Sequence, residues 1–231
     1  MATITENIQT LRSIKSDIKN AIIQKGGSVT DAFGTYAQAI TDLPSGGGGN
    51  EDLINLIERD VTTFDIPDGT TKIGNNAFND CTALTDVAIP ETVRSIGYQA
   101  FYNCKSLNSV TIPNRVTTID RYAFSYCLAL NSVTIPNSVT TIGMSAFYRC
   151  SALTNITIPN SVTYINYDAF TSCTALTSIT ILATTPPTLS SSVFDNTNNC
   201  PIYVPAESVD AYKTATNWSK YADRIQAIPT V

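Results

Sequence analysis

The sequence predicts a solenoid of 23-residue repeats whose short parallel strands stack into a ladder, with a small helical head before it and a cap behind it. The prediction depends on residue types that return at this fixed interval. Cysteines stand at Cys81, Cys104, Cys127, Cys150 and Cys173, and prolines at Pro67, Pro90, Pro113, Pro136 and Pro159. Ala-Phe pairs stand at 77/78, 100/101, 123/124, 146/147 and 169/170. One repeat cannot bury its own apolar face, so stacking must supply the core.

The bulk composition is that of a globular protein and argues against two classes of partner. Hydrophobic residues make up 43% of the 231 residues, which is enough for a substantial core, and only 14% are charged. A net charge of −5 disfavours nucleic acid, because phosphate binding needs clustered Lys and Arg. No apolar run is long enough to span a bilayer, so we expect no membrane insertion.

Residues 1–43 are predicted to form a helical anchor or oligomerisation segment. Residues 3–25 have the apolar spacing of an amphipathic helix, and residues 31–42 that of a shorter one. Two interpretations of the apolar stripe stay open. It closes a helical hairpin on itself, or it docks on other virion proteins or on other copies of the chain, for example in a homo-oligomer such as a trimer. The stripe consists of Ile4, Ile8, Leu11, Ile14, Ile18 and Ile22.

A glycine-rich linker at 44–50 separates this head from the solenoid. It lacks the Lys-Ser/Thr pair of a phosphate-binding loop. Residues 51–60 have the pattern of a short helix that caps the first turn. Five repeats follow from about residue 61, so the solenoid with its N-terminal cap is expected to occupy 51–181.

Each repeat is predicted to begin with a strand that has one buried face. Val87 and Ile89 alternate with Asp86 and Ala88, and Pro90 ends the strand because it has no N–H for the ladder. Residues 93–96 form either a second short strand or an extended turn, after which Phe101 points inward as the main core residue. Hydroxyl ladders are expected beside the strands, at Thr111, Thr134, Thr157 and Thr180.

The repeating cysteines are predicted to be small buried hydrophobic residues and not disulfides. Stacking brings them about 5 Å apart, but side chains stacked in parallel do not face each other as a disulfide requires. Cys200 falls outside the period, which makes it either the candidate reactive thiol or a residue of the cap core.

Residues 182–231 are expected to form the C-terminal capping segment, because the period breaks after Ile181. Residues 202–205 read as a final strand, and residues 206–215 and 218–226 as short helices. Trp218, the sole tryptophan, is predicted to cover the open end of the core.

The repeat skeleton L-x-x-V-x-I-P-x-x-V-x-x-I-x-x-x-A-F-x-x-C, as in residues 84–104, resembles the BspA-type leucine-rich repeat. The resemblance covers roughly 61–181, and the tail after it is similar to the caps that often close such repeats. It implies a right-handed, leucine-rich-repeat-type solenoid of the α+β class that is used for binding and not for catalysis. Such repeats are found in bacterial surface and adhesion-associated proteins.

The sequence carries no recognisable catalytic or cofactor-binding pattern. It has no histidine, which removes Ser-His-Asp and Cys-His catalysis and every zinc site that needs imidazole. It also lacks a Walker loop, a Rossmann fingerprint and a Cys-x-x-Cys pair. Carboxylates from separate repeats can still meet in space, as they do in glycosidases. We therefore expect a protein that is not an enzyme and that binds no metal and no cofactor.

Positions that change from repeat to repeat are not fixed by packing and indicate a possible recognition surface. They are rich in Tyr and Arg, the residue types that anchor binding surfaces. Either the rings pack on the flank of their own turn, or they form a stripe along one edge that binds a bacterial surface protein or glycan. The candidate partner-binding residues are Tyr98, Tyr102, Arg121, Tyr122, Tyr126, Tyr148, Arg149, Tyr164 and Tyr167.

Two hypotheses of function follow. The first is a phage tail or fibre-associated protein that recognises the host bacterium, because residues 18–27 and the glycine linker look like the helical leaders of phage tail adhesins. It predicts location in a virion, in keeping with an N-terminus that lacks a signal peptide. The alternative is a bacterial cell-surface or secreted BspA-like adhesin that binds host or neighbouring-cell proteins. A cytosolic scaffold also fits the composition but explains the linker less well.

Overall fold

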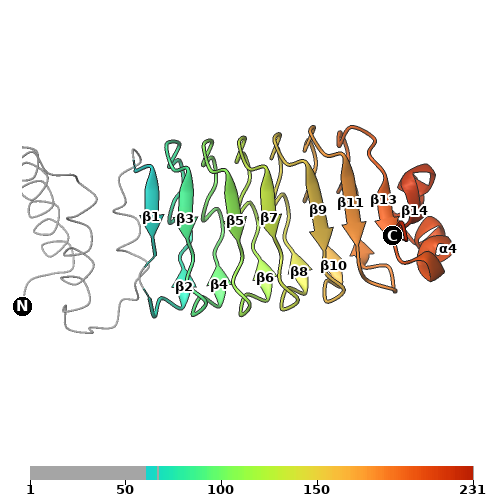
Figure 1. Cartoon of the computed structure of the whole chain (residues 1–231), viewed down its shortest axis with the longest axis horizontal. Coiled ribbons are helices and arrows are strands. Elements are labelled where there is room, and N and C mark those ends of the chain that lie inside the picture. Colours follow the sequence, from blue (N-terminus) through green and yellow to red (C-terminus); the bar gives the residue numbers. More distant parts are fainter. Residues whose placement is uncertain (1–60, 67, 231) are drawn as a thin grey trace, which may run out of the picture. The chain divides into compact units, whose positions relative to one another are not determined.

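The computed structural model describes residues 61–66 and 68–230, which form a parallel β-solenoid (Figure 1). The chain divides between Gly47 and Gly48 into two units, and all the described residues belong to the second. The predicted helical head, the glycine linker and the N-terminal cap at 51–60 lie outside the described residues.

The first strands of successive turns run parallel along the solenoid and pair within three sheets, of two, two and four strands (Figure 1). Phe64 pairs with Val87 and Val110 pairs with Val133, so the register advances by one 23-residue repeat from strand to strand. These strands are β1 (Thr63–Asp65), β3 (Asp86–Ala88), β5 (Ser109–Thr111), β7 (Ser132–Thr134), β9 (Asn155–Ile158), β11 (Ser178–Ile181), β13 (Ile202–Val204) and β14 (Ile225–Ala227).

A second, shorter strand follows in most turns, and these strands form a six-stranded parallel sheet. Of the two sequence interpretations for residues 93–96, the short strand is confirmed at Ser95–Ile96. The members are β2 (Lys72–Ile73), β4 (Ser95–Ile96), β6 (Thr118–Ile119), β8 (Thr141–Ile142), β10 (Tyr164–Ile165) and β12 (Thr188–Leu189).

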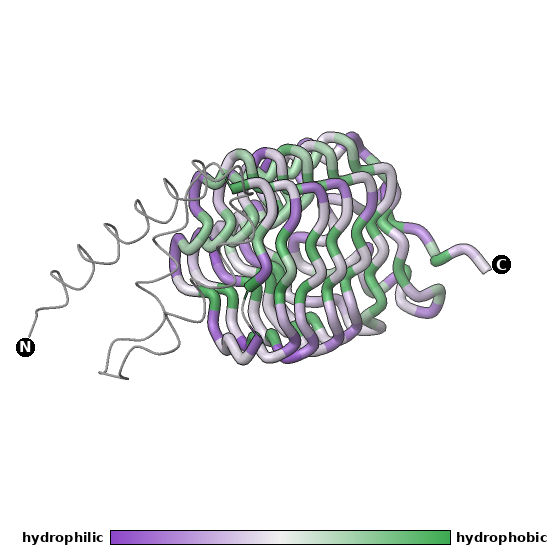
Figure 2. Tube along the Cα trace, turned by 60° about the vertical axis from the view of Figure 1, so that its left-hand side comes forward, coloured by the Kyte–Doolittle hydropathy of each residue, from purple (hydrophilic) through white to green (hydrophobic). Residues whose placement is uncertain are grey.

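Apolar and polar residues alternate in the first strand, so one face of the strand is buried and the other is exposed to solvent. In β5, Val110 is buried while Ser109 and Thr111 are exposed. The proline after the strand starts a tight turn, and in the second repeat the carbonyl of Pro90 accepts a hydrogen bond from the Val93 N–H (3.0 Å). Figure 2 shows the result, with hydrophobic residues recurring at the same place in successive turns.

A column of phenylalanine rings fills the core, as the sequence predicts. Phe78, Phe101 and Phe124 have no exposed surface, and neighbouring rings are stacked with their centroids 4.8 and 5.1 Å apart. The stack continues through Phe147 and Phe170 to Phe194. Because one ring from each turn contacts the ring of the next, the column joins the turns into a single core.

The cysteine column beside these rings is free of disulfides and buried, which confirms the prediction. The thiols of Cys104, Cys127, Cys150 and Cys173 also donate hydrogen bonds to phenylalanine carbonyls, for example Cys104 Sγ to Phe78 O (3.1 Å). Burial and the neighbouring thiol raise the pKa of Cys150 well above its usual value. Cys200 is also buried, and burial raises its pKa, so of its two sequence interpretations the structure favours a residue of the cap core.

The strand ladder does not end at Ile181, which corrects the expectation that the period breaks there. Ile179 pairs with Ile202, and Ile202 pairs with Ile225, so each strand follows the last by the same 23 residues. The repeat is hidden because the turns change length. Phe194 follows Phe170 by 24 residues, and Cys200 follows Cys173 by 27.

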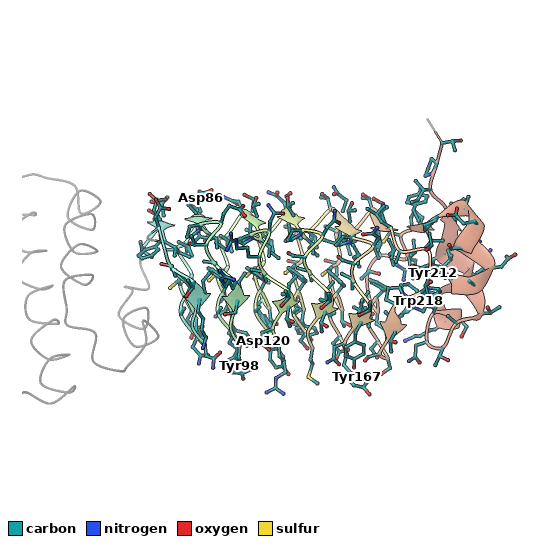
Figure 3. All side chains as sticks on the ribbon, turned by 90° about the horizontal axis from the view of Figure 1, so that it is seen from below. Asp86, Tyr98, Asp120, Tyr167, Tyr212 and Trp218 are labelled. Atoms are coloured by element: carbon teal, nitrogen blue, oxygen red, sulfur yellow. The ribbon has the colours of Figure 1, made fainter. Side chains whose placement is uncertain are left out.

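Short helices close the C-terminal end of the core: η1 (Ala206–Ser208), α4 (Val209–Thr214) and η2 (Ser219–Arg224). Trp218 is 1% exposed, and its ring lies 5.9 Å from Phe194 and 4.9 Å from Tyr212. Its Nε1 donates to the Pro187 carbonyl (2.7 Å). The predicted role of this tryptophan as the cover of the last phenylalanine is therefore confirmed (Figure 3).

Candidate functional site

The candidate site lies on the turns that follow the second strands, at residues 97–104, 120–127 and 143–150. Backbone hydrogen bonds join each turn to the next, such as Gln99 N–H to Arg121 O (3.2 Å) and Asn103 N–H to Ser125 O (2.8 Å). Equivalent side chains therefore line up in columns along one long edge. Figure 3 shows Tyr98 and Tyr167 on this edge and Asp86 on the opposite one.

Arg121 joins two tyrosines of this edge into a cluster. Its guanidinium carbon lies 5.2 Å from the centre of the Tyr98 ring and 5.7 Å from that of Tyr122. The two rings contact each other edge to face, with their centroids 6.1 Å apart. The Tyr122 hydroxyl also donates to the sulfur of Met144 (3.9 Å). A guanidinium held over two rings loses less freedom on binding a partner than one that moves freely.

Arg149 organises a second cluster one turn further along. Its guanidinium carbon lies 5.5 Å from the centre of the Tyr126 ring and 5.6 Å from that of Tyr148. The Tyr126 ring contacts Tyr102 on one side and Tyr148 on the other, each at 5.5 Å and edge to face. The structure therefore holds these tyrosines as a packed row, with the arginine at its exposed side.

The two clusters form one continuous patch. Burial raises the pKa of Tyr102, and the nearby Tyr126, the Asp80 carboxylate, Tyr122 and Tyr98 raise it further, so residues of both clusters lie near the same phenol. The Tyr102 phenol therefore stays protonated and can donate a hydrogen bond at neutral pH. We call this surface the tyrosine–arginine patch; it consists of Tyr98, Tyr102, Arg121, Tyr122, Tyr126, Tyr148 and Arg149.

The other two candidate tyrosines are not joined to the patch by any ring contact among residues 61–66 and 68–230. Tyr164 lies in β10, is half-buried, and its hydroxyl is 3.1 Å from the Ser190 hydroxyl. Tyr167 is 48% exposed, the most exposed tyrosine in the described part of the chain. The six candidate docking residues from Ile4 to Ile22 lie outside the described residues.

The patch residues are less exposed than a simple outward stripe would be. The five tyrosine rings are half-buried, while Arg121 and Arg149 are exposed. The rings thus pack along the flank of their turns, as the first interpretation expects, and support charged groups that face water.

Three patch residues have an unusual backbone conformation. Tyr122, Tyr126 and Arg149 have positive φ values of 59°, 62° and 60°. Equivalent positions in other turns share this conformation but hold Asn76, Gln99, Ser145 and Asp168, or Asp80, Asn103 and Ser172. Short polar residues such as Asn and Asp tolerate the left-handed region, whereas a bulky side chain there is strained. The repeat itself does not demand Tyr or Arg at these positions.

The sequence analysis missed Met144 and Asp120 as parts of this surface. Met144 is equivalent to Tyr98, Arg121 and Tyr167 of other turns. This equivalence in the repeat could have placed Met144 on the same surface. Asp120 accepts a hydrogen bond from the Arg121 N–H (2.6 Å) and so fixes the start of its turn. No sequence signal distinguished that aspartate from other surface carboxylates.

The opposite surface, formed by the first strands, exposes the carboxylate of Asp65 in β1 among mostly uncharged polar residues. It exposes Ser and Thr from β5 and β7, in line with the predicted hydroxyl ladders, and Asp86 from β3. In the described part of the chain, no three Cys, Asp or Glu side chains are grouped as a metal site would need. None of the helices between residues 61 and 230 is long and apolar enough to cross a membrane.

Comparisons with known proteins place this solenoid in a family. The BspA type leucine rich repeat region matches residues 58–176, which is more than half of the chain. A search of curated proteins gave no match. A leucine-rich repeat protein of T. pallidum is 27% identical with a TM-score of 0.56, and the match covers 63% of this chain and 69% of that one.

Two further solved structures share the fold. A leucine-rich cell surface protein from Faecalibacterium prausnitzii is 31% identical with a TM-score of 0.51. That match covers 64% of this chain and 50% of the other, so the chain spans about half of that protein. The pneumococcal vaccine antigen PcpA is 21% identical with a TM-score of 0.52 over 73% of this chain and 40% of its own length, which shows the fold alone. The repeat skeleton, the parallel solenoid and the match of residues 58–176 to the family all agree. The chain therefore belongs to the BspA-type leucine-rich repeat family.

Proposed function

We propose that the chain is a non-enzymatic binding module that recognises a protein on a cell surface through its tyrosine–arginine patch. The observation that carries the proposal is the placement of Tyr122, Tyr126 and Arg149 on left-handed backbone, where other turns hold Asn, Asp, Ser or Gln. Strained residues that the fold does not require are typical of functional surfaces. The F. prausnitzii relative is a cell surface protein, which supports a role for this chain in contacts at a cell surface.

The chemistry of the patch favours recognition over catalysis. Packed tyrosines supply contact area at low entropic cost, and arginines add directional hydrogen bonds. In the described residues of the patch the acidic neighbours are single carboxylates, such as Asp120, whose Oδ1 accepts a backbone N–H. A binding role therefore uses the groups that are present without requiring a nucleophile or an acid–base pair.

The repeats themselves supply substitutions that fit the backbone. Gln99 and Asn103 stand in the preceding turn where Tyr122 and Tyr126 stand. We predict that the double variant Tyr122→Gln/Tyr126→Asn folds and weakens cell binding at least about tenfold, the loss expected when two central anchors are removed. The measurement is a saturation isotherm of the labelled chain on a panel of intact bacterial cells that includes F. prausnitzii.

A matched control changes the opposite surface in the same way. Ser132→Asn and Thr134→Ala in β7 copy Asn155 and Ala88 from other turns, and they should leave the isotherm unchanged. Protease treatment of the cells should remove binding, and periodate oxidation of their glycans should not. Binding that survives the patch substitutions but not the β7 substitutions would place the site on the strand face instead.

The more specific role in a phage tail remains a prediction. Its sequence basis, the leader at 18–27 and the glycine linker, lies outside the described residues, and the bacterial relatives above lend it no support. The location in a virion and the docking of residues 1–43 on virion proteins or other copies are predictions of the same standing. Light scattering on the whole chain measures its oligomeric state. A strict monomer would contradict the prediction that the chain forms a homo-oligomer such as a trimer.

A further inference from the structure

We propose that Arg121 and Arg149 recognise carboxylates, so that the partner presents an acidic segment of polypeptide to the patch. The inference rests on the proposed function and specifies its chemistry. Both arginines are exposed, and each lies over two tyrosine rings. They stand in neighbouring turns, at residues 120–127 and 143–150, so a single segment laid along the edge can reach both.

Neither guanidinium is neutralised within the solenoid. Lys220 and Asp195, for example, form an ion pair (2.6 Å), whereas among the described residues no carboxylate forms an ion pair with Arg121 or Arg149. The nearest acid in sequence, Asp120, accepts the backbone N–H of Arg121 instead. An arginine fork that is oriented by its neighbours and lacks an acid matches the planar geometry of a carboxylate.

The same contacts argue against a sugar stacked on the rings. Sugar stacking needs an open aromatic face, but a guanidinium already lies over each of Tyr98, Tyr122, Tyr126 and Tyr148. The edges of these rings contact other tyrosines at interplanar angles of 60° to 81°. Hydrogen-bond donors are therefore available at the patch, and a guanidinium already occupies one face of each of these four rings.

The overall charge makes an acidic probe a demanding test. The chain carries a net charge of −5, so non-specific electrostatics repel an acidic peptide. Binding of such a peptide must then come from a local positive site. The two patch arginines are the local groups that the geometry offers.

The test uses the whole chain and fluorescence anisotropy with labelled hexaglutamate, hexaglutamine and tetragalacturonate. We expect hexaglutamate to bind and hexaglutamine not to bind. The double variant Arg121→Lys/Arg149→Lys should weaken the binding of hexaglutamate at least about tenfold, because lysine keeps the charge but loses the planar fork. Lys105→Arg, outside the patch, is the control variant and should have no effect.

The outcomes separate this inference from the proposed function. Binding of tetragalacturonate without hexaglutamate would replace the acidic peptide by an acidic glycan and overturn the proposal. Equal binding of hexaglutamine, no binding of hexaglutamate, or indifference to the lysine variants would also overturn it. If the Tyr122→Gln/Tyr126→Asn variant loses cell binding while the double lysine variant retains it, the patch stays a binding surface and only the carboxylate chemistry is wrong.

Discussion

Replacing Phe124 by alanine will lower the free energy of unfolding by about 3–5 kcal/mol, the usual cost of removing a fully buried aromatic ring. Phe124 has no exposed surface, and its ring lies 5.1 Å from Phe101 and 5.4 Å from Phe147. The substitution opens a cavity and also breaks the contact that joins one turn to the next. Urea unfolding followed by circular dichroism measures the loss.

The control for this substitution is Leu128→Ala in the same turn. Leu128 is 37% exposed, so its truncation should cost less than about 1 kcal/mol. If the two variants lose equal stability, the phenylalanine column is not the principal contact between turns. A broadened transition for Phe124→Ala would show that the turns on either side unfold separately.

Replacing Trp218 by alanine will cost about 3–5 kcal/mol as well, although this residue belongs to no repeat. The indole covers Phe194 and packs against Tyr212, and its Nε1 satisfies the buried carbonyl of Pro187. Its removal exposes the last ring of the column and leaves that carbonyl without its donor. Thermal unfolding of the variant should begin at a lower temperature than that of the wild type.

A second substitution separates the two contributions of this side chain. Trp218→Phe keeps an aromatic cover but loses the hydrogen bond, so it should cost about 1–3 kcal/mol, less than the alanine variant. Equal effects of the two variants would mean that the hydrogen bond, and not the covered core, is what the tryptophan contributes.

The sequence was sufficient to predict the fold where one residue type recurs at one position. Phe101, Cys104 and Pro90 each have equivalents at the same interval, and the period alone places them in the core or at a strand end. After Ile181 the period is no longer visible in the sequence, because extra residues in the turns displace Phe194 and Cys200. Ile202 and Ile225 maintain the strand register there. Isoleucine is too frequent in this sequence for its spacing alone to reveal a repeat.

The patch was harder to predict because its contacts join positions that are not equivalent. Tyr98 contacts Tyr122 across a spacing of 24, whereas Tyr126 contacts Tyr148 across 22. Which rings meet depends on the left-handed backbone at Tyr122 and Tyr126, since it redirects the side chain. Asn, Asp and Ser are frequent at the equivalent positions, which is typical of left-handed backbone. Their side chains alone do not show which tyrosine rings come into contact.

The central claim, that the tyrosine–arginine patch is the surface that meets the partner, is tested most directly by oxidative footprinting of the chain bound to cells. Tyr203 in β13 lies on the strand face and is half-buried, so it serves as an internal reference of the same residue type. We predict that oxidation of Tyr102, Tyr122, Tyr126 and Tyr148 falls on binding while that of Tyr203 is unchanged. Protection of Tyr203 with the patch tyrosines unaffected would contradict the claim.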